Sequence, residues 1–298
     1  MSRVLLVFVD GVGIGPDDPA TNAFTAAPPP AISSWLRDGR ASLVPLDARL
    51  DTDGLPQSGT GQYSLFTGDN GARKFGRHYG PWVPTALRDP LRKDNVLTRA
   101  VELGLRVTFA NAYPEELISA AQRDGAFHAL GPLRAGPPLV AAGAGVLTRH
   151  TDALRAGDAI ASEITNEGWR VHLQRHDLPA ITPAQAGANL GRIANAHDLT
   201  LFAHYSTDAA GHQQDLNAAI AALHTLDAFL SGALENLADD VVLLVVSDHG
   251  NLEDASTGHT RNAALGLVAS KDHEVIASEL HAITDVAEAV LLRLRDRR

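Results

Sequence analysis

Aspartate and histidine residues recur at short spacings in the last third of the chain. They stand at Asp208, His212, Asp248, His249 and His259. Carboxylate and imidazole groups together suit borderline divalent cations such as Zn2+ and Mn2+. The pattern therefore predicts a metal centre, and the absence of cysteine excludes both a thiolate metal site and a disulfide framework.

The acidic residues of this pattern follow strongly apolar stretches. Such stretches are typical of buried β-strands, and they occupy residues 4–9, 199–205 and 241–246. Asp10, Asp208 and Asp248 come at or shortly after their ends. Open α/β sheets hold their ligands at the carboxyl ends of parallel strands. We therefore expect the three carboxylates to meet at one edge of a sheet.

Apolar strands alternate with segments of helical periodicity, which is typical of a parallel sheet covered by helices. Helices are predicted at residues 32–36, 97–103 and 115–122, and a strand at residues 106–110. A longer helix is predicted to start at the N-cap Asp215 and a last one at Thr284. The predicted fold class is α/β, with a three-layer α/β/α core and a mostly parallel sheet.

The middle of the chain differs in composition. It is rich in Ala, Gly and Pro, with helix-breaking residues at 131–132 and 135–138 and a predicted helix over residues 156–165. We interpret residues 114–165 as a small cap inserted into a catalytic, metal-binding core. That core is predicted to consist of residues 1–113 and 166–298. Inserted elements of this kind commonly control the access of water to a site.

Composition excludes several classes of protein. Of the 298 residues, 45% are hydrophobic and 20% charged, as in an ordinary globular protein. The formal net charge of −10 argues against a nucleic-acid partner, because such proteins carry a basic face. It is compatible with a phosphorylated substrate, because metal ions supply local positive charge. No apolar stretch has the length of a signal-peptide core or a membrane span, so we expect a cytoplasmic protein without a membrane partner.

A serine lies among small residues in the stretch from residue 55 to 68. Ser58 is followed by glycines and then by an apolar turn, a pattern that places its hydroxyl at a helix N-terminus. The exposed amides and the helix dipole there favour an anion, either an alkoxide or a phosphate. Taken alone, the pattern fits an ordinary serine N-cap equally well, and such caps are very common.

Three glycines after the first predicted strand offer a second interpretation, a dinucleotide-binding turn. They are Gly11, Gly13 and Gly15. That turn opens directly into a helix, whereas here Pro16 and the polar residues after it do not continue an apolar helix. The simpler interpretation is that the glycines let the loop turn beside a bound ion.

Five motifs together resemble the alkaline phosphatase superfamily. In chain order they are Asp10-Gly11-Val12-Gly13, Ser58 in its small-residue turn, Asp208-x-x-x-His212, Asp248-His249-Gly250-Asn251 and His259-Thr260. They are most similar to the phosphomutase branch, cofactor-independent phosphoglycerate mutase and phosphopentomutase. The resemblance spans roughly the first 80 and the last 100 residues and implies an alkaline-phosphatase-like fold. The chain departs from the pattern at Gln62, where the family often has histidine, and in its shorter insertion.

The resemblance implies a site with two divalent metal ions. One set of ligands consists of Asp10, Ser58, Asp248 and His249. The other set consists of Asp208, His212 and His259. Mn2+ or Zn2+ is expected, with Mg2+ as an alternative, and Ser58 is expected to be the nucleophile, with Thr60 as an alternative.

The implied activity is phosphoryl transfer from a small phosphate ester through a phosphoserine. Two metals about 4 Å apart offset the charge on the attacking and leaving oxygens. Transfer to water would make the protein a phosphomonoester hydrolase, and transfer to a second hydroxyl a phosphomutase. Two alternatives remain: a hydrolase of another ester, such as a sulfate or phosphonate, and a non-catalytic metal-binding protein on the same fold.

A basic group follows the predicted nucleophile along the chain. It consists of Arg73, Lys74, Arg77 and His78. These side chains are candidates for binding the substrate, since cations of this kind grip phosphate oxygens. The alternative is a solvated, charged loop. His204 and Tyr205 are candidate supports for the metal ligands.

Overall fold

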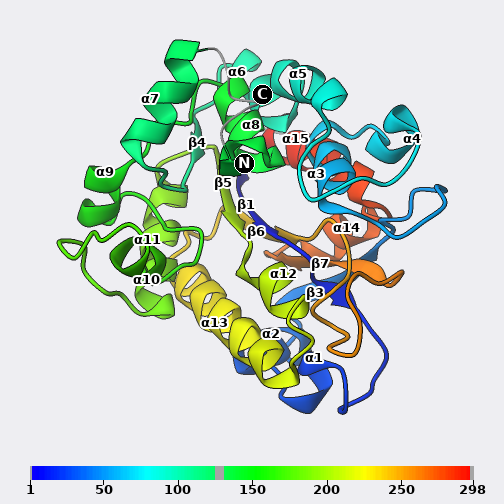
Figure 1. The fold of residues 1–298 in the computed structure, drawn as a ribbon. Helices are drawn as coiled ribbons and strands as arrows, with labels where there is room; N and C mark the ends of the chain where they lie inside the picture. The colour runs from blue at the N-terminus through cyan, green and yellow to red at the C-terminus, as the bar shows by residue number, and fades with distance from the viewer. Residues whose placement is uncertain (1, 125–130, 296–298) are drawn as a thin grey trace.

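The computed structural model describes residues 2–124 and 131–295, and these contain one mixed sheet of seven strands. The strand order is β2-β7-β6-β1-β5-β4, and β3 also pairs with β7. The strands are β1 (Arg3–Val9), β2 (Gly13–Ile14), β3 (Ala41–Leu46), β4 (Val107–Phe109), β5 (Leu199–His204), β6 (Val241–Val246) and β7 (Ala263–Ala269). Helices cover both faces of the sheet (Figure 1).

Four neighbouring strands run parallel. β1 pairs with both β5 and β6, and β4 pairs with β5. Strand β7 is antiparallel to β6, and β2 and β3 are antiparallel to β7. Because β1, β5 and β6 are adjacent and parallel, the segments that follow them leave the sheet at the same edge. The predicted α/β fold with a mostly parallel sheet is confirmed.

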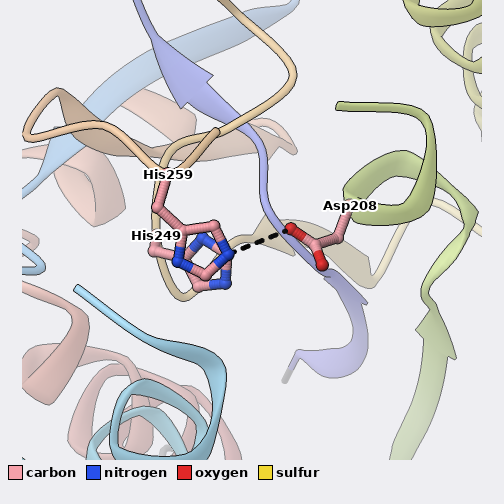
Figure 2. Close-up of side chains that lie close together, drawn as sticks. All are labelled: Asp208, His249 and His259. Atoms are coloured by element: carbon pink, nitrogen blue, oxygen red, sulfur yellow. Dashed lines mark ion pairs between the residues drawn. The ribbon is translucent and has the colours of Figure 1, made fainter. Parts of the chain in front are cut away.

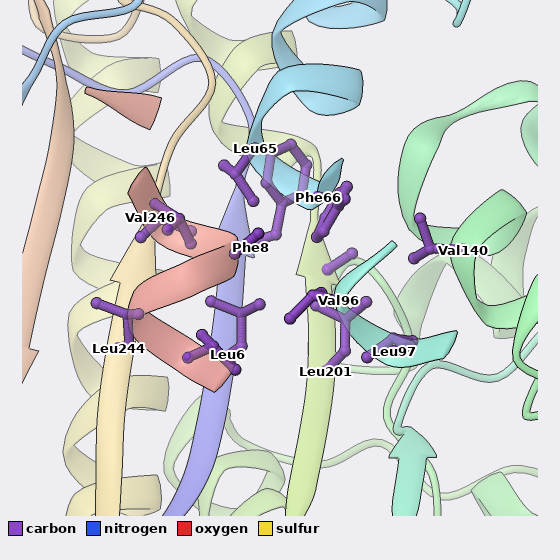
Figure 3. Close-up of a cluster of buried hydrophobic side chains, with 14 of the residues drawn as sticks. Leu6, Phe8, Leu65, Phe66, Val96, Leu97, Val140, Leu201, Leu244 and Val246 are labelled. Carbon is purple, nitrogen blue, oxygen red and sulfur yellow. The ribbon is translucent and has the colours of Figure 1, made fainter. Parts of the chain in front are cut away.

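Side chains that alternate along β1 build a core on each face of the sheet. Leu6 and Phe8 belong to one core, and Leu5 and Val7 to the other. A strand buried on both faces has no polar alternation, which explains its continuous apolar sequence. Figure 3 shows the first core, where side chains from three parallel strands meet those of α3, α6 and α8.

Two sets of helices enclose these cores. On the first face lie α3 (Ser58–Thr67), α5 (Thr85–Lys93), α6 (Val96–Glu102), α8 (Gly136–Gly143), α14 (His273–Ser278) and α15 (Val286–Arg295). On the second face lie α2 (Pro30–Arg37), α11 (Pro183–Asn195) and α13 (Leu216–Glu235). The fold is therefore the predicted three-layer α/β/α arrangement.

The remaining elements are short. They are α1 (Ala23–Ala26), α4 (Gly71–Phe75), α7 (Glu115–Asp124), α9 (Thr151–Ala156), α10 (Glu167–Val171), α12 (Ser206–Gly211) and the 3-10 turns η1 (Gly131–Arg134) and η2 (Ile283–Asp285). Asp215 caps α13 as predicted, by accepting hydrogen bonds from the N–H groups of Asn217 and Ala218. Among the described helices, none combines the length and apolar character needed to cross a membrane.

The middle of the chain contributes to several parts of the molecule. Leu139 and Val140 of α8 are buried in the first core, whereas Pro132 and Ala135 line the cavity described below. The helix predicted over residues 156–165 is wrong, because α9 ends at Ala156 and an isolated bridge follows within that range. The division of the chain into a core and a cap over residues 114–165 stays a prediction.

Candidate metal centre

Three carboxylates converge where the parallel strands end. Asp10 directly follows β1, Asp248 lies two residues beyond β6, and Asp208 lies in α12 just after β5. Gly11 allows their close approach. It has a φ of +65°, and a Cβ at this position would lie 2.3 Å from Oδ1 of Asp208. Only glycine fits a backbone that is both left-handed and so close to a carboxylate.

The carboxylates and histidines form two overlapping groups of potential ligands. One group comprises Asp10, Asp248 and His249, and the other comprises Asp208, His249 and His259. Within each group the ligand atoms lie within 4.8 Å of one another. Figure 2 shows the imidazole rings of His249 and His259, whose centroids are 4.1 Å apart, facing the carboxylate of Asp208.

His212 joins the second group. Its Nε2 lies 3.3 Å from Oδ2 of Asp208 and 3.2 Å from Nε2 of His259. His259 donates from Nδ1 to the carbonyl of Pro56, which leaves its Nε2 directed at Asp208 and His212. The structure thus brings together all six aspartates and histidines named as metal ligands from the sequence.

Burial and mutual repulsion dominate the electrostatics of this cluster. Burial raises the pKa of Asp10, and the charge of Asp208 raises it further, whereas a hydrogen bond with His249 lowers it. Burial also raises the pKa of Asp248 well above its ordinary value, and the charges of Asp10 and Asp208 raise it further. Burial lowers the pKa of His249, but the charges of Asp248, Asp10 and Asp208 outweigh it, and the net pKa is about 10. A proton on His249 therefore offsets part of the carboxylate charge.

The arrangement fits divalent cations. Oδ1 of the buried Asp10 has Nε2 of His249 at 3.3 Å and no further polar partner within the described part of the chain, so it could accept a cation as well. Two imidazole nitrogens, those of His212 and His259, face each other beside a carboxylate. Cations ligated by these oxygen and nitrogen atoms would satisfy all of them and remove the repulsion between the carboxylates.

Ser58 lies beside this cluster as the first residue of α3. Its Oγ is 2.9 Å from Nε2 of His249, and the side chain is buried. The N-cap position of α3 belongs to Gln57, and its side chain makes no capping hydrogen bond. The ordinary serine N-cap weighed in the sequence is therefore not what this hydroxyl forms.

The alternative nucleophile, Thr60, faces a different part of the molecule. Its hydroxyl accepts a hydrogen bond from the N–H of Tyr79 at 3.1 Å and lies within 3.5 Å of the carbonyls of Gln57 and Tyr79. It is buried against this loop rather than among the metal ligands. The geometry favours Ser58.

Gln62 lies between two of the carboxylates. Its Nε2 donates to Oδ2 of Asp248 at 3.2 Å and to Oδ2 of Asp10 at 3.4 Å, and its Oε1 accepts from the N–H of Gly136 at 2.8 Å. In the sequence this residue is only a departure from a family pattern. In the structure it positions two of the proposed ligands.

Two further residues order the loops that carry the ligands. Asn251 donates from Nδ2 to Oδ1 of Asp208 at 2.7 Å, which orients that carboxylate. The fully buried Glu253 accepts hydrogen bonds from Gly13, Asn251, Thr260 and Asn262. Their place in the sequence beside Asp248 and His249 indicates that they order this loop, although neither was named as a ligand or catalytic residue.

The two residues predicted to support the metal ligands, His204 and Tyr205, lie in different surroundings. His204 is buried at the end of β5, donates from Nδ1 to the carbonyl of Ser162 at 2.7 Å, and has its pKa lowered to about 4 by burial. It contacts the site only through its carbonyl, which accepts from the N–H of Asp10 at 2.9 Å. Tyr205, in contrast, lines the same cavity as Asp10 and Ser58.

The basic group is not part of this cavity. Lys74 pairs with Asp69, and Arg73 lies 3.7 Å from Asp51. Nε2 of His78 lies 3.3 Å from the carbonyl of Thr52. Arg77 is placed over the ring of Tyr79. None of the four lines the cavity that contains Asp10, Ser58 and Asp208, so their proposed contact with substrate has no support from the geometry.

Part of the chain is similar in sequence to known proteins. Residues 184–294 match the model of a family described as the Metalloenzyme superfamily. A stretch of 104 residues, 32% of this chain, is 35% identical to the 2,3-bisphosphoglycerate-independent phosphoglycerate mutase of Thiobacillus denitrificans. This match spans only 20% of the length of that mutase.

Several solved structures share the fold over the whole chain. The PH0037 protein from Pyrococcus horikoshii has a TM-score of 0.60 and 12% identity, with 100% of this chain and 98% of that chain covered. Alkaline phosphatase from the Antarctic bacterium TAB5 has a TM-score of 0.52 and 10% identity, with 99% of both chains covered. The family match over residues 184–294, the partial relative and the shared fold agree with the resemblance to the alkaline phosphatase superfamily drawn from the sequence.

Proposed function

We propose that this protein is a metal-dependent phosphoryl-transfer enzyme that acts on a phosphate monoester through a phosphoserine at Ser58. The observation that carries the proposal is the position of the Ser58 hydroxyl, 2.9 Å from His249 and on the wall of a cavity shared with Asp10 and Asp208. A cation with a purely structural role requires ligands but no alcohol beside them. This arrangement disfavours the alternative of a non-catalytic metal-binding protein.

Two divalent cations are proposed, with Mn2+ or Zn2+ as the first choices. The first would be held by Asp10, Ser58, Asp248 and His249. The second would be held by Asp208, His212 and His259. When bound, such ions supply the positive charge that lowers the pKa of a hydroxyl and stabilises negative charge on the reacting oxygens.

The chain's own residues would perform the remaining tasks. Ser58 attacks phosphorus in line with the leaving alcohol oxygen, and the amides and dipole at the start of α3 favour its alkoxide. Gln62 and Asn251 hold the carboxylates of Asp10, Asp248 and Asp208 in place. Water or a second hydroxyl would then accept the phosphoryl group from Ser58, and this choice separates a phosphatase from a mutase.

The test compares wild-type protein with Ser58→Ala after loading with Mn2+ or Zn2+. Turnover of phosphate monoesters should fall by roughly 1000-fold or more when a covalent nucleophile is removed. Metal content should change little, because six side-chain ligands remain. Mass spectrometry of acid-quenched wild-type reactions should show a phosphoryl adduct on the peptide that contains Ser58.

Ser231→Ala, on the exposed side of α13, is the matched control and should retain full turnover. An adduct on Thr60 would move the nucleophile by two residues. Full turnover in both Ser58→Ala and Thr60→Ala would exclude a covalent route through α3.

A further inference from the structure

The candidate metal centre forms one end of a cavity of about 430 Å3 whose other walls are largely apolar. These walls consist of Pro81, Trp82, Pro132, Ala135, Tyr205 and Ala209. A cavity of this size accommodates a small organic ligand. The walls opposite the metal ligands therefore contact the part of a substrate that is not the phosphate.

No lysine or arginine is found among the described residues that line this cavity. Arg134 lies over the ring of Trp82 but is not among the lining residues, so a second anionic group on the substrate would find no lysine or arginine among the described residues of the apolar walls. Burying an unpaired charge in such surroundings is costly, so the cavity disfavours substrates that carry a second anionic group besides the phosphate.

Trp82 is fixed next to the proposed nucleophile. Its carbonyl oxygen packs against Gly59, where an added Cβ would lie only 2.0 Å from that oxygen. The guanidinium carbon of Arg134 lies 4.8 Å from the centroid of the indole ring, a cation–π contact that restrains the ring. Trp82 thus lines the cavity and contacts Gly59, the residue that follows Ser58. It offers a large apolar surface beside the proposed nucleophile.

We infer that the substrate is a phosphate monoester whose alcohol part is uncharged and apolar, with a flat ring that packs against Trp82, rather than a phosphoglycerate. This inference rests on the proposed function and specifies the leaving group at that site. Tyr205 and the two prolines complete a slot suited to an aryl group, since aromatic rings gain additional energy from contacts with one another.

The test uses two substrates that differ by a single carboxylate, phenyl phosphate and 4-carboxyphenyl phosphate, with 3-phosphoglycerate as a third. With the metal-loaded enzyme, kcat/KM for phenyl phosphate should exceed that for the carboxylated ester by about 10-fold or more, as expected for one unpaired charge. Phenylphosphonate, which has no ester bond to hydrolyse, should quench the tryptophan fluorescence.

Trp82→Ala should raise KM for phenyl phosphate by about 10-fold and leave kcat for that substrate less affected, because it removes binding surface and no reacting group. In Trp82→Phe the quenching should disappear, since Trp35 and Trp169 are buried elsewhere. Trp169→Phe is the control and should retain both KM and quenching.

The outcomes separate the two proposals. If kcat/KM for 3-phosphoglycerate or for 4-carboxyphenyl phosphate were higher than for phenyl phosphate, the inference would be overturned, while the proposed phosphoryl transfer would stand. An unchanged KM in Trp82→Ala, with folding verified by circular dichroism, would also overturn it. Absence of turnover for every monoester, with metal bound, would contradict the proposed function itself.

Discussion

His249 belongs to both groups of potential metal ligands, so its imidazole is where the two proposed sites meet. We expect His249→Ala to weaken binding of both ions, each by about 10-fold or more. The first ion loses a ligand, and the second is affected because all three carboxylates, Asp208 included, lose a common partner. Competition with a chelating dye measures both affinities. His224→Ala, on an exposed position of α13, is the control. If His249→Ala bound two ions with unchanged affinity, His249 could not be the residue where the two sites meet.

His204 makes folding stability depend on pH. Its pKa is about 4 in the folded protein, because burial disfavours the charged form, and about 6.5 in an unfolded chain. Between these values the unfolded chain binds a proton that the folded chain does not. The contribution of His204 to the unfolding free energy is therefore complete above pH 6.5. It falls as the pH drops towards 4, by up to about 3 kcal/mol.

Urea unfolding at several pH values, with a chelator present, measures this dependence. His204→Gln should lose most of the decrease in unfolding free energy between pH 6.5 and pH 4.5, because no proton binds at that position. His197→Gln, at a partly exposed position, should retain the wild-type dependence. An identical decrease in wild type and His204→Gln would assign the effect to other groups.

At the scale of elements, Glu253 connects the loops after β1 and β6 with the segment that precedes β7. It accepts from the backbone of Gly13 and Asn251 and from the side chains of Thr260 and Asn262. Glu253→Gln places an amide where these donors require an acceptor. We expect a loss of about 2–4 kcal/mol of unfolding free energy and weaker metal binding.

Denaturant unfolding with and without chelator measures the effect of Glu253→Gln. Glu274→Gln, on the exposed surface of α14, removes the same charge and should change stability by only a few tenths of a kcal/mol. Equal stability of the two variants would mean that the three loops are held by other contacts.

Long apolar patterns made some elements predictable. Helix α13 and strands β1, β5 and β6 each contain many apolar residues whose spacing fits one kind of element. Because neighbouring parallel strands end at the same edge of a sheet, the sequence also places Asp10 and Asp248 at one edge. Ser58 was identified through the family pattern and not through its local sequence, which fits a common cap.

Other features depend on contacts that local sequence does not contain. The start of the last helix was predicted at Thr284, but this residue lies in η2, and α15 begins at Val286. The chain beyond α9 leaves the helical path to pair with Asn111, nearly fifty residues earlier. Residues 73–78 have a phosphate-binding composition, yet Arg73 lies near Asp51 and His78 near Thr52, and neither lines the cavity.

At the scale of the whole molecule, metal binding should add to thermal stability. A ligand present at 100 times its Kd stabilises the folded state by about 2.7 kcal/mol. For a chain of this size we expect removal of each ion by a chelator to lower Tm by about 5 °C, measured by calorimetry. In the Asp248→Asn variant the chelator should lower Tm by less than in the wild-type protein. A Tm that is insensitive to the chelator would contradict a metal centre at this edge of the sheet.

The central position of β1 has a consequence for biosynthesis. The strand is synthesised well before its two neighbours, which contain residues 199–204 and 241–246. At usual translation rates this apolar strand waits on the order of 10 s or more with both edges unpaired. Nascent chains stalled before residue 199 should therefore bind chaperones strongly. Because Asp10 must await Asp248 and His249, the metal ions are expected to bind only after these residues have been synthesised and cannot guide the earlier stages of folding.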